Sequence, residues 1–294
     1  MKVLVGGGTG FIGKALVGTL KQAGHDVTII SRTKAPGRIS WNDVSKSPLP
    51  KCDAVVNLAG ENILNPLRRW NEGFLHDLRQ SRIETTKTLA RKIADATNPP
   101  KVFVSSSAVG YYPPSDTMEY TEDCPPSSSD TLAQLCSDWE DSANLPDGCS
   151  TRVVKIRIGV VLGRNGGVIQ QTIWPYWLGL GGVIGSGKQY FPWIHLDDMT
   201  GIITHALDNE HVAGVLNGVA PEIVTNEGFT KEYARALWRP AVIPAPSFVF
   251  NLIYGNERAK LLLEGQKVIP KRTLELGYKF KFPQLKGALA NIVS

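Results

Sequence analysis

Cysteine is scarce in this chain, and long apolar runs are absent. Four cysteines, Cys52, Cys124, Cys136 and Cys149, are spread over 294 residues without a CxxC pair. This spacing excludes a disulfide framework and a cysteine-rich zinc site. No apolar run approaches the ~20 residues that a membrane span needs, and the first strand candidate follows Met1 directly, which leaves no room for a targeting peptide. We therefore expect an intracellular, cytoplasmic protein with reduced thiols and no membrane partner.

Histidine is also sparse, and charge of one sign is not concentrated anywhere. None of the five histidines lies at metal-ligand spacing from another histidine or a cysteine, so no metal site is predicted. The net charge of +5 comes from 32 Lys+Arg and 27 Asp+Glu interleaved along the chain, which argues against a nucleic-acid partner. A modest positive excess suits an anionic small ligand. The identity of a small-molecule substrate and the oligomeric state stay open.

What the sequence does contain is a β-α-β pattern at its N-terminus. An apolar run at residues 2–6 is followed by glycines, by apolar residues at helical spacing from Phe11 to Leu20, and by a second apolar run at 27–30. Such a unit has parallel strands joined by a right-handed crossover. The glycines therefore lie where the first strand becomes the helix.

Those glycines form a GxxGxxG pattern. The first permits a tight turn, the second lets the backbone approach a pyrophosphate, and the third allows close packing of the helix on the strand. The N–H groups and dipole of the helix N-terminus then favour the phosphates. This placement predicts a dinucleotide site. The residues expected to contact the dinucleotide are Gly7, Thr9, Gly10, Phe11, Ile12 and Gly13.

The end of the second strand indicates which dinucleotide binds. A fold that prefers NAD usually places Asp or Glu there, to bind the ribose 2′-hydroxyl. This chain has Ser31 and Arg32 instead. A hydroxyl and a planar guanidinium suit a 2′-phosphate, so NADP(H) is the predicted cofactor. The alternative is that Arg32 only begins a solvated basic loop with Lys34 and Arg38.

Strand and helix patterns continue to alternate through the first half of the chain. Strands are expected at 54–58, 102–106 and 153–158, and helices at 71–96 and 132–143. This alternation predicts an α/β fold of the Rossmann type, with a doubly wound parallel sheet. We expect an NADP-binding domain at 1–163, with return segments near 192–220, and a small C-terminal substrate lobe formed mainly by 164–294.

Five ordered motifs together resemble one known family. They are GGTGFIG at 7–13, NLAG at 57–60, SSSAVGYY at 105–112, RIGVVLG at 157–163 and PWIHLDDM at 192–199. This chain resembles the extended and atypical short-chain dehydrogenase/reductases, the NAD-dependent epimerase/dehydratase superfamily. The stretch NLAGENI at 57–63 is similar to a poorly characterised branch of that superfamily.

The resemblance implies further cofactor contacts. It places Leu58, Ala59 and Gly60 beside the adenosine and its ribose, and Ser105 and Ser106 beside the nicotinamide ribose. It also implies that Arg82 reaches the cofactor from a long helix and that Val160 lines the nicotinamide pocket. The alternative for 57–60 and 157–163 is ordinary sheet core and turn.

One departure from the family bears directly on catalysis. Active members carry YxxxK on the helix before the fifth strand, where the Tyr phenol transfers a proton and the Lys lowers its pKa. Alignment of the helix on Glu140 puts Leu132 and Cys136 at those positions. Leucine has no proton to exchange, and a thiol supplies no fixed positive charge.

The remaining catalytic candidates are Ser107, Tyr111 and Tyr112. Ser107 occupies the position of the substrate-polarising Ser or Thr of the family, and either tyrosine could act as a proton donor from a different direction. Without a neighbouring lysine, a tyrosine pKa near ~10 makes slow acid-base chemistry. The alternative is that both tyrosines pack as pocket wall.

Other motifs are set aside on their context. GVIGSGKQ, from Gly182, lacks the Ser or Thr of a phosphate-binding loop and the helix that should follow, so a lid-like loop near a substrate is favoured. His195 with Asp197 has no GxSxG partner and does not predict a hydrolase. Trp174, Trp177 and Trp193 could stack on a ring substrate or form an aromatic lobe core.

Two functions from different classes are therefore carried forward. The first is an NADP-dependent oxidoreductase that moves hydride between NADP(H) and a carbonyl or alcohol carbon. The second is a catalytically silent NADP(H)-binding sensor whose lobe recognises a partner. A nucleotide-sugar epimerase is less favoured, because it needs an efficient tyrosine base.

Overall fold

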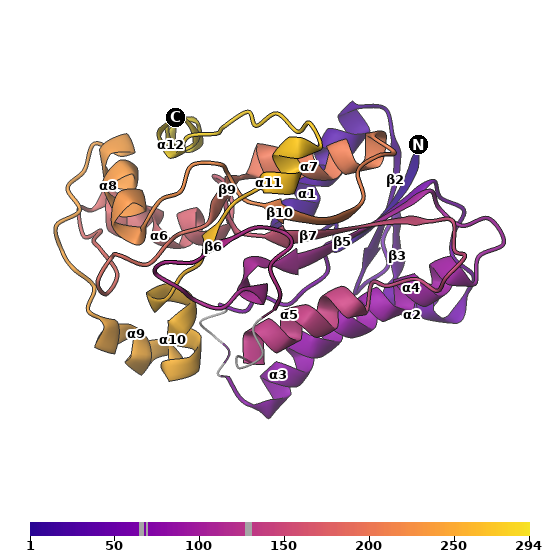
Figure 1. Ribbon diagram of the computed structural model, residues 1–294, viewed down its shortest axis with the longest axis horizontal. Helices are drawn as coiled ribbons and strands as arrows, with labels where there is room; N and C mark the ends of the chain where they lie inside the picture. The colour runs from indigo at the N-terminus through magenta and orange to yellow at the C-terminus, as the bar shows by residue number, and fades with distance from the viewer. Residues whose placement is uncertain (65–67, 69, 127–130) are drawn as a thin grey trace.

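A seven-stranded parallel sheet forms the centre of the protein. The computed structural model describes residues 1–64, 68, 70–126 and 131–294. The strand order is β10-β7-β5-β4-β1-β2-β3 (Figure 1), which is the doubly wound Rossmann order and confirms the predicted fold. The strands are β1 (Lys2–Gly6), β2 (Asp26–Ser31), β3 (Arg38–Ser40), β4 (Ala54–Asn57), β5 (Val102–Ala108), β7 (Arg152–Ile158) and β10 (Gly214–Gly218).

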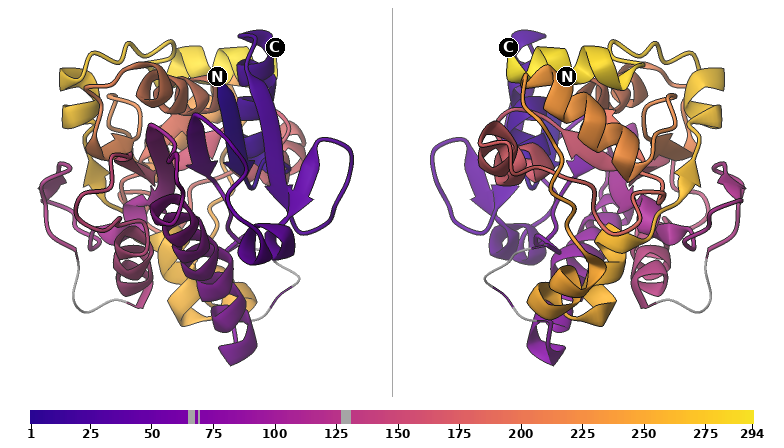
Figure 2. Two further views of the ribbon diagram at one scale, coloured as in Figure 1. Left: turned by 90° about the vertical axis from the view of Figure 1, so that its right-hand side faces the viewer. Right: turned by 90° about the vertical axis from the view of Figure 1, so that its left-hand side faces the viewer.

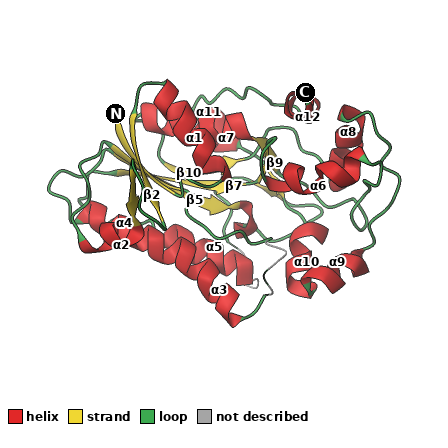
Figure 3. Ribbon diagram, turned by 180° about the vertical axis from the view of Figure 1, so that it is seen from behind, coloured by secondary structure: helices red, strands yellow, loops and turns green. Residues whose placement is uncertain are grey.

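Helices cover both faces of this sheet (Figures 1 and 3) because its strands are apolar on both sides. In β1, Val3 and Val5 pack with one set of helices, whereas Leu4 packs with the other. The first set is α1 (Phe11–Gln22) and α7 (Leu196–Asp208); the second is α2 (Trp41–Lys46), α3 (Glu72–Arg79), α4 (Thr85–Ala94) and α5 (Thr131–Asp141). A π-helical turn, Gln80–Glu84, joins α3 to α4.

A second hydrophobic cluster lies beyond the carboxyl ends of the strands. It gathers Trp193, Tyr176, Phe229, Tyr233 and Leu289 from segments far apart in the sequence. The helices of this lobe are α6 (Gly167–Trp177), α8 (Asn226–Ala236), α9 (Ser247–Tyr254), α10 (Asn256–Leu263) and α12 (Leu285–Val293). Two short parallel pairs accompany them, β8 (Val160–Leu162) with β9 (Trp193–His195) and β6 (Glu119–Tyr120) with β11 (Lys267–Val268).

The chain crosses between the two regions more than once. After β9, α7 and β10 return to the sheet, and α11 (Lys271–Glu275) lies against β10 before α12 packs on α8 (Figure 2). Within the described part of the chain, no helix is both long and apolar enough to cross a bilayer.

Two glycines of α1 allow the effect of close packing on stability to be measured apart from the effect of helix propensity. A Cβ at Gly13 would collide with the Gly7 carbonyl oxygen, whereas a Cβ at Gly18 would meet no atom within 4 Å. We expect Gly13→Ala to lower the free energy of unfolding by about 1–3 kcal/mol. Gly18→Ala should raise it by about 0.5–1 kcal/mol. Urea denaturation of both variants checks this, and equal effects would contradict the packing assigned to Gly13.

Candidate functional site

The glycine turn between β1 and α1 has no space for side chains. Gly7 has φ +74°, and a Cβ there would lie 2.6 Å from the carbonyl oxygen of Leu58. Gly10 is the N-cap residue of α1, and no described side chain caps this helix. The first amides of α1 therefore face an open cradle of backbone, which suits a phosphate. Thr9, Phe11 and Ile12 lie within this turn and the first turn of the helix.

Ser31 and Arg32 end β2 beside this turn. The Ser31 side chain is buried, and its hydroxyl donates to the Thr33 carbonyl oxygen. The Arg32 side chain is 90% exposed, and its nearest acidic partner is Glu61, at 3.9 Å. The guanidinium is therefore free to meet an anion. Sequence reasoning missed Glu61; its position directly after Gly60 was the available signal.

Residues 58–60 lie between the glycine turn, which contacts Leu58 and Ala59, and Arg82, which lies against Gly60. Their contact with a cofactor stays a prediction. Arg82 donates to the Glu61 carbonyl oxygen at 2.8 Å. Its pKa is lowered by burial. Arg82 lies on the π-helical turn, a feature that is frequent at functional sites.

Ser105 and Ser106 are buried in β5. The Ser106 hydroxyl donates to the Asn57 carbonyl oxygen at 2.9 Å, and that of Ser105 donates to the Ser106 carbonyl at 3.5 Å. Both hydroxyls thus make contacts within the sheet. Their contact with a nicotinamide ribose stays a prediction.

Ser107 belongs to a buried charged network. Its side chain is 2% exposed, and its hydroxyl donates to Glu140 Oε1 at 2.8 Å. Glu140 also accepts from Arg157 through both oxygens, Nε to Oε1 at 2.7 Å and Nη2 to Oε2 at 3.0 Å. This bidentate ion pair joins α5 to β7. Ser107 is therefore turned toward the pair instead of toward a substrate.

The two predicted proton donors differ in their surroundings. Tyr112 is fully buried; it accepts from Arg157 Nη1 at 2.7 Å, and its oxygen lies 2.8 Å from Asn217 Oδ1. Burial raises its pKa to about 12. Tyr111 is half-buried, with its ring centroid 3.4 Å from the Arg157 guanidinium, and burial raises its pKa as well. These positions favour a packing role for Tyr112 over the proton-donor role predicted for it.

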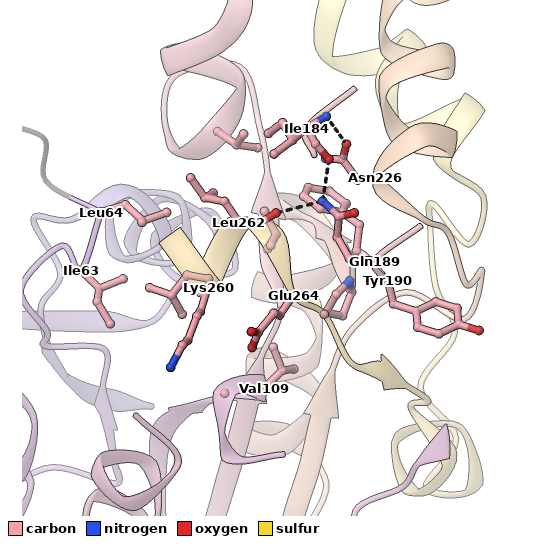
Figure 4. A pocket seen from close by; sticks show the side chains of 18 of the residues that line it. Ile63, Leu64, Val109, Ile184, Gln189, Tyr190, Asn226, Lys260, Leu262 and Glu264 are labelled. Carbon is pink, nitrogen blue, oxygen red and sulfur yellow. Dashed lines mark hydrogen bonds between the residues drawn. The ribbon is translucent and has the colours of Figure 1, made fainter. Parts of the chain in front are cut away.

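A partly open cavity of about 510 Å³ lies between the sheet and the lobe (Figure 4). Its walls include Ala108, Ile158 and Val160 near the strand ends, and Arg82. Ser107, Tyr111 and Tyr112 are not among the described residues that line it. Most of its wall is apolar, so it suits an apolar ligand. Other wall residues from the lobe are Val168, Leu180, Phe191, Phe229, Phe250 and Leu261.

Leu132 and Cys136 line this cavity from α5. The two positions at which the family resemblance leads us to expect YxxxK therefore face the place where a ligand would bind. They give that wall a hydrocarbon side chain and a thiol, neither of which replaces the Tyr–Lys pair.

The polar groups of the cavity come mainly from the C-terminal part of the chain. In Figure 4, Lys260 and Glu264 extend from α10 and its end toward the wall formed by Val109. Gln189 instead bonds the Ile184 and Leu262 carbonyl oxygens, both at 3.0 Å, which fixes the loop that holds it. Sequence reasoning missed Lys260 and Glu264 because no local motif marks them, and Gln189 entered it only as the last residue of GVIGSGKQ.

The tryptophans named from the sequence divide into two kinds. Trp193 is buried in the lobe core and donates to the Glu222 carbonyl oxygen at 3.1 Å. Trp174 and Trp177 are exposed, and neither belongs to that core. His195 is buried and accepts from the Asp197 N–H, as an N-cap of α7. No three His, Cys, Asp or Glu side chains gather as a metal site in the ranges that the structure describes.

Comparison with known proteins identifies the family. A model of the NAD dependent epimerase/dehydratase family matches residues 3–217. The chain belongs to the NAD dependent epimerase/dehydratase family. A second model, described as a domain of unknown function (DUF1731), matches residues 245–292.

Within the NAD dependent epimerase/dehydratase family, similar relatives span the whole chain. The human epimerase family protein SDR39U1 is 56% identical over 294 residues, covering 100% of both chains. The chloroplastic SDR39U1 homologue of Arabidopsis thaliana is 38% identical over 307 residues, covering 100% of this chain and 87% of the plant protein. A crystal structure of the human protein with NADPH has a TM-score of 0.98 at 56% identity and covers 99% of each chain. UDP-N-acetylglucosamine 4-epimerase from Bacillus cereus shares the fold alone, with a TM-score of 0.77 at 18% identity over 99% of this chain and 98% of that one.

Stability at alkaline pH should report the burial of Tyr112. Its folded pKa of about 12 lies above the ~10 of an unfolded tyrosine. The folded chain holds this proton more tightly, so the contribution is fully present below pH ~10 and is lost as the pH rises toward about 12. We expect the free energy of unfolding to fall more steeply across this window in the parent protein than in Tyr112→Phe, by up to about 1.4 kcal/mol per pH unit. Denaturant titrations measure both slopes, and parallel slopes would contradict the assignment.

Proposed function

We propose that this chain is an NADP(H)-dependent oxidoreductase that transfers hydride to a small apolar acceptor. One observation carries the proposal. The apolar cavity reaches Ala108 and Ile158, at the carboxyl ends of β5 and β7, where doubly wound sheets bind their ligands. An acceptor held there would lie beside the crevice that receives a dinucleotide.

The residues around the glycine turn fit NADP(H). A Cβ has no room at Gly7 or Gly13, which keeps the turn tight and the helix close to the strand, and Gly10 between them would let the backbone approach the pyrophosphate. Arg32, exposed at the end of β2, would hold the 2′-phosphate. The presence of NADPH in the human relative supports the same choice. When bound, the cofactor supplies a hydride from its nicotinamide ring.

The supply of a proton limits which acceptors are suitable. Ser107 donates to Glu140, Tyr112 is buried, and the pKa of Tyr111 is raised by burial. None of the three predicted catalytic residues is thus placed to release a proton at neutral pH. A quinone needs no strong acid, because hydride addition gives a stabilised hydroquinone anion that takes its proton from water. Quinones are therefore favoured over simple aldehydes and ketones.

A second function is supported by a different observation. The Ser107–Glu140–Arg157 network continues from Arg157 to Tyr112 and to the Glu122 carbonyl oxygen, and none of its three residues lines the cavity. A protein in which this catalytic position is structural could bind NADP(H) without turnover and act as a sensor. A nucleotide-sugar epimerase is less supported, because the largely apolar wall offers few partners for a sugar nucleotide.

Cofactor preference should depend on Arg32. We expect Arg32→Glu to weaken NADPH binding at least about tenfold and to leave NADH binding nearly unchanged, since only NADPH carries the 2′-phosphate. Arg38→Glu makes the same change of charge six residues later, at the start of β3, and should have a smaller effect. Calorimetric or fluorescence titration measures all four affinities. Equal losses in the two variants would indicate a diffuse basic loop instead of a phosphate site.

The activity itself is tested with an acceptor panel. We expect the purified protein to oxidise NADPH faster with quinones than with aldehydes or ketones of similar size. The double variant Leu132→Tyr/Cys136→Lys restores the proton donor and its cation on the cavity wall, and should raise the carbonyl rates by about 10²-fold or more. NADPH absorbance follows the turnover, and circular dichroism checks the fold. Tight NADPH binding with no turnover on any acceptor would instead support the sensor.

A further inference from the structure

A large part of the exposed apolar surface is concentrated in two segments of the lobe. Ten of the fourteen large hydrophobic side chains that are exposed among the described residues lie between 174 and 180 or between 238 and 253. We call these ten side chains the indole face. They are Trp174, Trp177, Leu178, Leu180, Trp238, Val242, Ile243, Phe248, Leu252 and Ile253.

The two segments that carry the indole face lie side by side. Leu180 pairs with Ala241 and Ile184 with Ala245, and Ile243 N–H donates to the Gly181 carbonyl oxygen at 3.3 Å. From there the chain continues directly into α9, along the left edge of the molecule in Figure 1 and toward the viewer in the right panel of Figure 2. The exposed side chains thus belong to one region, and patches of this kind mark interaction sites.

Trp238 is exposed at a backbone position that does not favour a tryptophan. Among the described residues it alone combines a positive φ, 55°, with a side chain other than glycine. It follows the last turn of α8, where its N–H bonds to the Arg235 carbonyl oxygen and the next N–H bonds to that of Ala234. Helices usually end in this way on glycine. Here the position holds a tryptophan that is 89% exposed, so strain and exposure occur together on one residue.

Helix α9 also leaves apolar side chains exposed. Its sequence is SFVFNLIY, and none of its residues is buried. An apolar helix usually packs its apolar side against the protein. Phe250 lines the cavity, whereas Phe248, Leu252 and Ile253 are exposed to solvent. The helix therefore has one apolar side toward the cavity and another without a partner in the described chain.

The charges of the region favour a lipid surface as the partner. Residues 165–187 and 240–256 contain no Asp, Glu, Lys or Arg. Arg239 directly precedes the second segment. Its Nε donates to the Trp177 carbonyl oxygen at 2.8 Å and its Nη1 to the Trp238 carbonyl oxygen at 3.2 Å, and it forms no ion pair with a described carboxylate. Indole rings prefer the boundary between bilayer and water, and the remaining guanidinium N–H groups of Arg239 suit the phosphate of a lipid headgroup.

We propose that the indole face binds the surface of a lipid bilayer, with Trp238 inserted at the headgroup level and Arg239 on a lipid phosphate. The cavity lies directly behind this face, since Pro175, Leu180, Ala245 and Phe250 belong to both its wall and these segments. An apolar cavity beside a bilayer would receive ligands that dissolve in lipid. The binding itself rests on the surface alone and is independent of hydride transfer.

Trp238→Gly tests the proposal without disturbing the fold. Glycine relieves the positive φ, so this variant should be no less stable than the parent protein. We expect it to bind phosphatidylcholine/phosphatidylglycerol vesicles at least about tenfold more weakly in a flotation assay. Arg239→Gln should weaken binding several-fold to these anionic vesicles and little to phosphatidylcholine alone. Met118→Ala, which removes an exposed side chain outside the face, should bind as the parent does.

Several results would overturn the proposal. One is that the full chain floats with neither kind of vesicle. Another is that Trp238→Gly and Trp238→Asn, which both tolerate the left-handed backbone, float as the parent does. A third is a dimer in light scattering that Trp238→Gly dissociates while vesicle binding is absent, which would make the indole face an interface between two copies. Blue-shifted tryptophan fluorescence on vesicle addition, lost in Trp238→Gly, would support insertion.

Discussion

The buried ion pair between Arg157 and Glu140 is the interaction around which the candidate site is organised. Burial by itself lowers the pKa of Arg157, but the bonds to Glu140 and Tyr112 raise it above its ordinary value, so the guanidinium stays charged inside the protein. Removal of one partner from such a pair typically costs about 3–5 kcal/mol, because the other charge is left without compensation. The pair thus fixes β7 to α5, and it also determines how Ser107, Tyr111 and Tyr112 are oriented.

This network and the composition of α5 lead to the same conclusion about chemistry. Ser107 and Tyr112 direct their hydroxyl groups into the network, while Leu132 and Cys136 give the cavity a hydrocarbon and a thiol in place of a phenol and a cation. The family fold is kept without the tyrosine and lysine that the family resemblance leads us to expect on α5. What remains is a dinucleotide crevice joined to an apolar cavity, which can place a hydride donor beside an apolar acceptor and exclude water. A hydride transfer that needs only a donor close to its acceptor and the exclusion of water is compatible with the side chains described in the site.

The sequence predicted the parts of the structure that local chemistry determines. The glycine turn and the β-α-β unit that leads to Arg32 follow from spacing within about 30 residues, because turn geometry and crossover handedness are local constraints. The direction of the Ser107 hydroxyl could not be predicted in this way, since its partner Glu140 is 33 residues away. The different burial of Tyr111 and Tyr112 could not be predicted either. These adjacent residues make different distant contacts, Tyr111 with Arg157 of β7 and Tyr112 with Asn217 of β10. Lys260 and Glu264 carried no motif, Glu61 was not singled out within NLAGENI, and the exposure of α9 opposed its apolar sequence.

The cavity has two walls of different character, and this difference connects the proposed chemistry to the proposed surface. The inner wall consists of strand ends and α5, held by parallel ladders and by the Arg157–Glu140 pair. The outer wall consists of the segments around Leu180 and Ala245 and of α9, which contributes no buried residue. Segments with few buried contacts open at the lowest free-energy cost, so we expect a ligand to enter through the outer wall. Its outside is already apolar, and opening toward a bilayer would expose little additional hydrocarbon to water, whereas opening toward solvent would expose the whole cavity.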